Sequence, residues 1–195
     1  MPTGALHIPL ASALIHMSNI SMWYLTRAFA ISAYFILALS MVLGMLRSIA
    51  RTSGERVSWI IDDLHAFTMT LTALLIVGHL VTLLLHDFYH FTLLNIVLPG
   101  NQPYREEAVN LGVFGLWGMV LVLGSSYLRR VIPHKLWRSL HTEAFGVFLL
   151  LTAHGILAGS DASEAWMRGV YGGVGAAVVF MGILRLVIRP KPASK

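Results

Sequence analysis

Residues 60–85 read IIDDLHAFTMTLTALLIVGHLVTLLL, a run that is apolar apart from two aspartates near its start, scattered threonines and two histidines. A helix needs roughly 20 mostly apolar residues to cross the hydrocarbon core of a bilayer. This run is long enough to span a membrane, and His65 and His79 both fall inside the predicted span.

Four further stretches have a similar character, and the whole chain shares their composition. Hydrophobic residues make up 56% of the 195 residues and charged residues only 12%, whereas about a quarter of a soluble domain is charged. The sequence therefore predicts an all-α integral membrane bundle of about five transmembrane helices. The predicted spans are residues 22–46, 60–85, 111–128, 140–157 and 166–188.

The segments outside the spans are short. Residues 1–21 are predicted to be an interfacial segment because polar residues and a proline interrupt their apolar pattern, and a sixth, short N-terminal interfacial helix is an open alternative. Residues 22–188 then form the transmembrane domain, and residues 189–195 form a basic cytoplasmic tail. Residues 99–103, PGNQP, predict a turn after the second span and a small cap on that loop.

Basic residues gather in alternate connections between the spans. By the positive-inside rule the C-terminus is expected in the cytoplasm and the N-terminus outside, in the inner (cell) membrane. Spans 60–85 and 140–157 then run in the same direction. The basic residues that give the chain its net charge of +5 lie beside the spans. This position indicates the lipid bilayer as the partner and argues against nucleic acid.

Four of the nine histidines lie within two of the predicted spans. His79 lies fourteen positions after His65, and His154 lies thirteen after His141, so each pair is separated by roughly 20 Å along its helix. Because the two spans run parallel, we expect His65 with His141 at the inner level and His79 with His154 at the outer level. In a straight helix a step of thirteen residues places His154 about 140° around the helix axis from His141. This predicts either that span four bends, with Gly146 as a candidate position, or that the two metal sites do not lie on a common axis.

These pairs suit one kind of metal chemistry. Two neutral imidazoles on opposite sides of a ring are what a six-coordinate haem iron requires, and ionisable residues inside a bilayer are rare and by default functional. The absence of cysteine excludes iron–sulfur clusters and thiolate-ligated haem. Zinc is disfavoured because each level supplies only two histidines. Two b-type haems are the leading interpretation; a haem-free transporter or proton relay, or a structural subunit, stays open.

Several short stretches carry a resemblance to a known family. They are Leu64-His65-Ala66, Gly78-His79, Trp137-Arg138-Ser139-Leu140-His141, His154-Gly155 and residues 23–28. Here the sequence resembles the ferric reductase-like transmembrane domain family, which includes ferric reductases, NADPH oxidases and the haem subunit of bacterial methionine sulfoxide reductase systems, and within it a compact bacterial branch. The resemblance covers about residues 22–160 and implies two b haems bound by the two histidine pairs.

The resemblance also implies a function. It implies transmembrane electron transfer from a separate cytoplasmic flavoprotein or a quinol to ferric iron, oxygen or a periplasmic partner. Larger members carry a flavin- and nicotinamide-binding domain after the last span, whereas this sequence ends seven residues beyond Ile188. We therefore expect no flavin or NAD(P) site in this chain, and an oxidoreductase component that needs a separate electron donor.

Four further residues are candidates for secondary roles. Arg27, near the outer end of the first span, is a candidate partner for the propionates of the outer haem, or else a snorkelling interface residue. Arg138 is the corresponding candidate for the inner haem, although arginines collect in inner loops in any case. His86 and His90 are interpreted as ordinary loop residues, with metal binding or proton transfer as the alternative, since two histidines are a weak metal signal.

Overall fold

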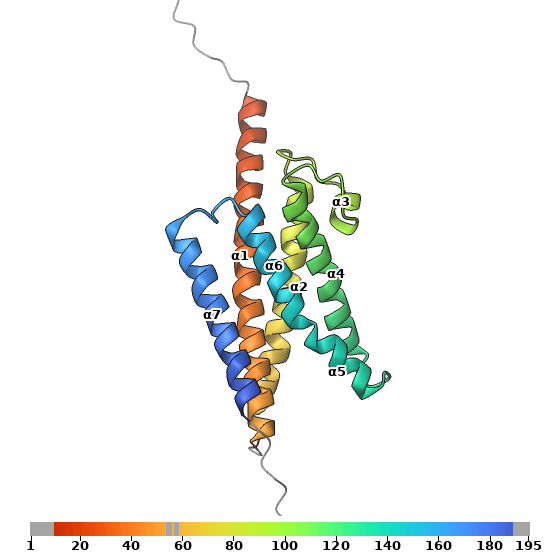
Figure 1. Cartoon of the computed structure of the whole chain (residues 1–195). Coiled ribbons are helices and arrows are strands. Elements are labelled where there is room, and N and C mark those ends of the chain that lie inside the picture. The colour runs from red at the N-terminus through yellow and green to blue at the C-terminus, as the bar shows by residue number, and fades with distance from the viewer. Residues whose placement is uncertain (1–9, 54–55, 57–58, 189–195) are drawn as a thin grey trace, which may run out of the picture.

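The computed structural model describes residues 10–53, 56 and 59–188, with side chains from residue 19 onward. Helices account for all regular secondary structure in this part of the chain. Five helical segments are long and apolar enough to cross a membrane, which confirms the predicted fold class. The helices are α1 (Leu10–Thr52), α2 (Trp59–Leu85), α3 (Leu93–Val97), α4 (Glu106–Tyr127), α5 (His134–Thr142), α6 (Ala144–Ala158) and α7 (Ala165–Val187), shown in Figure 1.

The first helix is longer than the predicted first span. α1 begins at Leu10 and passes through residue 21 without a break, so the described part of the N-terminal segment continues the first span. His7 and the tail 189–195 lie outside the described residues, as does the side chain of His16. The division of the chain at residues 21 and 188 stays a prediction.

The fourth span is made of two helices, α5 and α6, which meet at an angle (Figure 1). The backbone of Glu143 between them has φ −61° and ψ −12°, and its N–H bonds to the carbonyl of Leu140 at 3.2 Å. This three-residue step is tighter than an α-helical turn and changes the helix direction. The bend therefore lies two positions after His141, whereas Gly146 lies inside α6.

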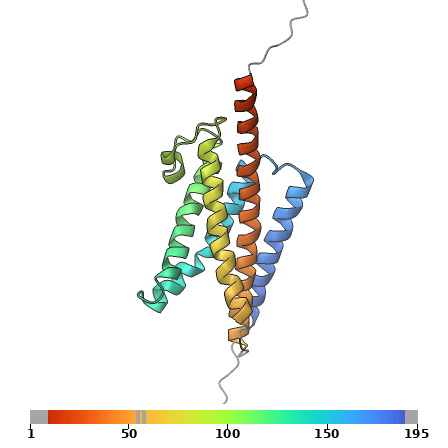
Figure 2. The same ribbon diagram turned by 180° about the vertical axis from the view of Figure 1, so that it is seen from behind.

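The helices that carry the histidines are each supported by a neighbour. α2 packs along α1, and α5 and α6 pack against α4, while α1 also contacts α6 and α7. Figures 1 and 2 show α1 at the centre of the bundle, with α2 and the α5–α6 span running in the same direction. The predicted parallel course of the two histidine-bearing spans is thus confirmed.

The interior and exterior of the bundle differ as expected for a bilayer protein. The core joins residues of α1, α4, α6 and α7, among them Leu37, Met41, Val122, Phe148 and Val178. Large apolar side chains such as Leu74, Phe180 and Leu186 are exposed on the outside, where lipid would cover them. Threonine hydroxyls within α2 donate to carbonyls of the preceding turn, so they need no water.

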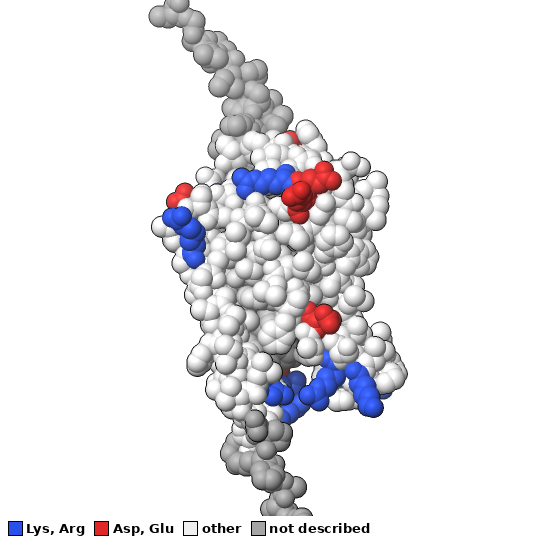
Figure 3. Space-filling model, viewed as in Figure 1, with Lys and Arg blue, Asp and Glu red and all other residues white. Residues whose placement is uncertain are grey.

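The two ends of the bundle differ in charge. Arginines and lysines gather at the lower end in Figure 3, and most acidic residues lie at the upper end. We call the lower end the basic end; it carries Arg47, Arg51, Arg129 and Arg130. The short helix α3 lies at the opposite end (Figure 1), in the predicted loop cap, where Gly100 has φ 97°.

Candidate functional site

His65 of α2 and His141 of α5 face each other near the basic end. Their ring centroids are 6.4 Å apart, and the ring planes are at 86°. An imidazole nitrogen binds a metal at about 2 Å and lies roughly 1.2 Å from the centre of its own ring, so two rings on opposite sides of one ion have centres roughly 6.3 Å apart. The separation of His65 and His141 therefore suits two axial ligands of one metal.

The Nδ1 atom of each of these two rings is held by the neighbouring helix. His65 Nδ1 lies 2.9 Å from the carbonyl oxygen of Ser40 and 3.1 Å from its hydroxyl, and Ser40 in α1 is fully buried. His141 Nδ1 lies 3.4 Å from the hydroxyl of Ser126 in α4. Both rings are thus oriented through Nδ1 by a serine of the adjacent helix.

The second pair repeats this arrangement at the opposite end. His79 Nδ1 lies 3.1 Å from the carbonyl oxygen of Thr26 in α1, and His154 Nδ1 lies 2.8 Å from that of Ala108 in α4. Among the described residues, the Nε2 atoms of the four histidines have no hydrogen-bond partner. A ring that donates from Nδ1 to a carbonyl presents Nε2 as a metal ligand, which is the usual second-shell arrangement of metal-binding histidine.

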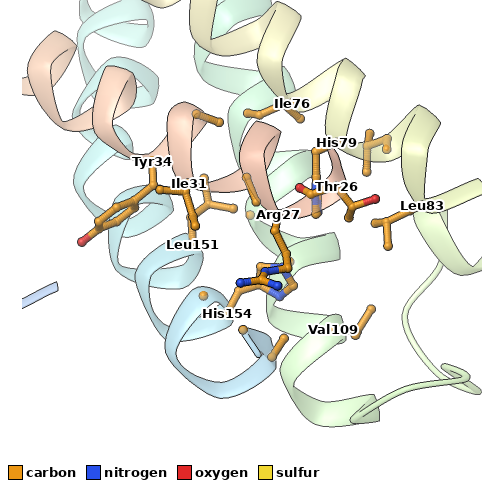
Figure 4. A pocket seen from close by; sticks show the side chains of 18 of the residues that line it. Thr26, Arg27, Ile31, Tyr34, Ile76, His79, Leu83, Val109, Leu151 and His154 are labelled. Carbon is orange, nitrogen blue, oxygen red and sulfur yellow. The ribbon is translucent and has the colours of Figure 1, made fainter. Parts of the chain in front are cut away.

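His79 and His154 lie on opposite walls of a cavity between α2 and α6. The cavity has a volume of about 230 Å³, more than ten times the space that one water molecule needs. Figure 4 shows both histidines among mostly apolar side chains. The apolar lining includes Ile31, Ile76, Leu83 and Leu151. The space is therefore suited to a large, mostly apolar group with two axial imidazoles.

Glycine residues allow neighbouring helices to approach two of the histidines closely. A Cβ atom added at Gly112 of α4 would lie 2.8 Å from the ring of His154, and one added at Gly44 of α1 would lie 3.2 Å from the ring of His65. Real Cβ atoms essentially never make contacts under 3.0 Å. Gly112 therefore provides the room that His154 occupies.

Arg27 lies in the wall of the cavity and is paired with a residue that the sequence did not single out. Its Nε donates to Asp161 Oδ2 at 2.8 Å, and its Nη2 donates to Asp161 Oδ1. The side chains of Arg27 and Asp161 are 30% and 16% exposed. The pair ties α1 to the loop between α6 and α7 at the edge of the cavity.

At the basic end, the side chain of Arg138 is exposed, and its backbone carbonyl accepts a hydrogen bond from the Thr142 hydroxyl at 2.8 Å. Arg47, near the end of α1, forms an ion pair with Asp62 of α2. Trp137 stacks on His141 with ring centroids 5.2 Å apart and planes at 21°. Trp137, which the sequence offered only as part of a motif, is therefore a direct neighbour of this histidine pair.

The two histidines after α2 differ from each other. His90 is exposed, as expected of a loop residue. His86 is only 1% exposed, and its ring lies among Trp23, Tyr89 and Phe91. Burial lowers the pKa of His86, so the ring is neutral at pH 7.

Fold and site together define an all-helical, multi-pass membrane protein with two levels of paired histidines. No cluster of three or more histidine, cysteine, aspartate or glutamate side chains placed to hold a metal ion occurs among the residues that the structure describes. Comparisons of the chain with protein-family models, with curated proteins and with solved structures found no match.

Proposed function

We propose that this chain transfers electrons across the membrane through two b-type haems, one at each histidine level. The observation that carries the proposal is the shared orientation of the four histidines, each held through Nδ1 by a neighbouring helix. Such anchoring fixes the tautomer and leaves Nε2 for a metal. Histidines that only linked helices by hydrogen bonds would not be expected at four matched positions.

Each level has a donor set that suits a haem, and the level of His79 and His154 also lines a cavity. Each level supplies two imidazoles, and a porphyrin supplies the four remaining iron ligands, so no third protein ligand is needed. The apolar cavity between His79 and His154 would exclude water from the ring. At the other level the spacing of His65 and His141 suits one iron.

The electron carrier would be the haem iron, whereas the protein residues hold, orient and insulate it. Ser40, Thr26 and Ala108 fix three of the imidazole rings through backbone oxygens. Arg27 supplies a guanidinium at the cavity wall, where Asp161 accepts from its Nε and Nη2. A guanidinium has five N–H donors, so further N–H groups of Arg27 would be left for a propionate while Asp161 holds the side chain in place.

The charge at the two ends supports the proposed orientation in the membrane, and the family resemblance supports the proposed direction of electron transfer. The basic end would face the cytoplasm and receive electrons from a separate flavoprotein or a quinol. The opposite end would pass them to ferric iron, oxygen or a periplasmic partner. The family resemblance of the histidine motifs supports this order of donor and acceptor.

Visible spectroscopy of the detergent-purified full chain tests the proposal. We expect a low-spin b-type spectrum after reduction with dithionite, and about two haems per chain by the pyridine haemochrome method. The expected stoichiometry follows from the two histidine levels. Folded protein that stays colourless after expression with ample haem would contradict the proposal and leave the histidines as a proton relay.

A second prediction concerns the close contact at Gly112. Replacing Gly112 with Ala would place a Cβ atom against the ring of His154, and overpacking of this kind costs about 1–3 kcal/mol. We expect the ring to shift and the haem at the His79–His154 level to be bound more weakly. Haem content and thermal unfolding of the purified variant measure the effect.

Gly124 offers the matched control on the same helix. A Cβ atom added there meets nothing within 4 Å, so Gly124→Ala is expected to retain both haems. Equal haem contents in the Gly112 and Gly124 variants would show that the close contact with His154 does not matter for haem binding.

A further inference from the structure

A second hollow lies at the basic end, apart from the cavity between His79 and His154. It has a volume of about 450 Å³, within the range typical of small-molecule sites. Its walls come from the last turns of α1, the turn after α4 and the start of α5. The lining residues are Arg47, Arg51, Arg129, Arg130, His134 and Trp137.

Among the residues that the structure describes, most of the positive charge around this hollow has no acidic partner. Arg47 pairs with Asp62, while Arg51 and Arg129 lie close enough to Arg47 to repel it. Within the part of the chain that the structure describes, Arg51, Arg129 and Arg130 form no ion pair. Several guanidinium groups around one concave space create a positive potential that favours a bound anion.

Trp137 forms part of the wall of the hollow. Trp137 lines the hollow, and its Nε1 is buried without a hydrogen-bond partner among the described residues. Because this N–H is not accessible from the hollow, Trp137 contributes its aromatic ring to the wall. Packing of Trp137 between His134 and His141 holds the indole in place.

We propose that this hollow binds a phosphate group, carried either by the headgroup of an anionic phospholipid or by a soluble phosphorylated ligand. Guanidinium forks match phosphate oxygens in pairs, and three of the lining arginines form no ion pair among the described residues. Basic pockets between helices on the cytoplasmic side of a membrane are known to bind such headgroups. Exposed Leu128, Val131 and Leu136 lie near the lining residues in sequence and offer apolar surface for an acyl chain.

The experiment uses the purified full chain and two probes in parallel. Phosphatidylglycerol binding in a neutral detergent is measured by native mass spectrometry, with phosphatidylcholine as the neutral lipid. Inorganic phosphate is titrated separately and followed by thermal stabilisation. We expect the double variant Arg129→Gln/Arg130→Gln to weaken the binding of the effective probe about thirtyfold, since each basic residue contributes a factor of about five.

Lys135→Gln is the matched control, because Lys135 is an exposed cation at the same end and does not line the hollow. It is expected to bind like the unchanged chain. Selective binding of phosphatidylglycerol that depends on the arginines would support a lipid headgroup, and dependence seen only with phosphate would support a soluble ligand. Should the double variant fail to fold, Arg51→Gln is expected to weaken binding in the same direction by about fivefold.

The proposal does not rest on haem binding, and haem content is measured in the same samples to keep the two apart. Loss of phosphate or lipid binding with unchanged haem content supports the anion site. Binding that is equal in the double variant and in Lys135→Gln, or no preference over phosphatidylcholine together with no effect of phosphate, would overturn it. Loss of haem from the double variant with anion binding intact would overturn it as well.

Discussion

Replacing His79 with Ala is expected to lower the haem content of the purified chain from about two to about one. The imidazole of His79 is the only candidate ligand on the α2 side of the cavity, and its Nδ1 anchor to Thr26 has no role once the ring is gone. His65 and His141 lie near the other end of the bundle and keep their own contacts. The pyridine haemochrome assay and the reduced spectrum measure the loss.

His90→Asn provides the control for His79→Ala. His90 is exposed and has φ 45°, a conformation that asparagine tolerates better than most residues, so this variant is expected to retain both haems. His65→Ala should also leave one haem, with a spectrum that differs from that of His79→Ala because a different level remains. Two haems in the His79→Ala protein would contradict ligation by His79.

The spans and their direction relative to one another could be predicted from the sequence because a bilayer imposes a simple rule on composition. Residues 60–85 were predicted as a span, and α2 covers Trp59–Leu85. The same rule placed His65 and His141 at one level, and the structure brings these rings to 6.4 Å. Length, hydropathy and charge at the ends are local properties, so they can be read without knowledge of packing.

The contacts that orient the histidines were not predictable in the same way. The partner of His79 is a carbonyl of Thr26, 53 positions away, and the partner of His154 is a carbonyl of Ala108. Every residue has a backbone carbonyl, so no side-chain type marks these positions in the sequence. The bend at Glu143 could not be predicted from the sequence either, because the residue at this position is neither proline nor glycine.

The arginine hollow shows a further limit of sequence reasoning. Arg47 and Arg129 belong to different connections, and each is explained singly by the positive-inside rule. Only the packing of α4 and α5 near the end of α1 reveals that their guanidinium groups surround one space. The sequence shows these arginines, but it does not show that they lie around one space in the structure.

The ion pair between Arg27 and Asp161 provides the second large expected effect. Asp161→Asn leaves the Arg27 guanidinium at an apolar cavity wall without its carboxylate. Breaking a buried pair costs about 3–5 kcal/mol, and partial exposure of both side chains reduces this to roughly 1–3 kcal/mol. We expect a lower thermal unfolding temperature for the purified protein, measured in one detergent at one pH.

The double variant Arg27→Met/Asp161→Asn distinguishes loss of the pair from loss of a charge. Replacing both partners removes the uncompensated guanidinium and adds an apolar side chain to an apolar wall, which is often neutral or stabilising. Its unfolding temperature is therefore expected to return close to that of the unchanged chain. If the double variant were less stable than Asp161→Asn alone, Arg27 would stabilise the bundle through contacts other than Asp161, and the pair would not be what joins α1 to the loop before α7.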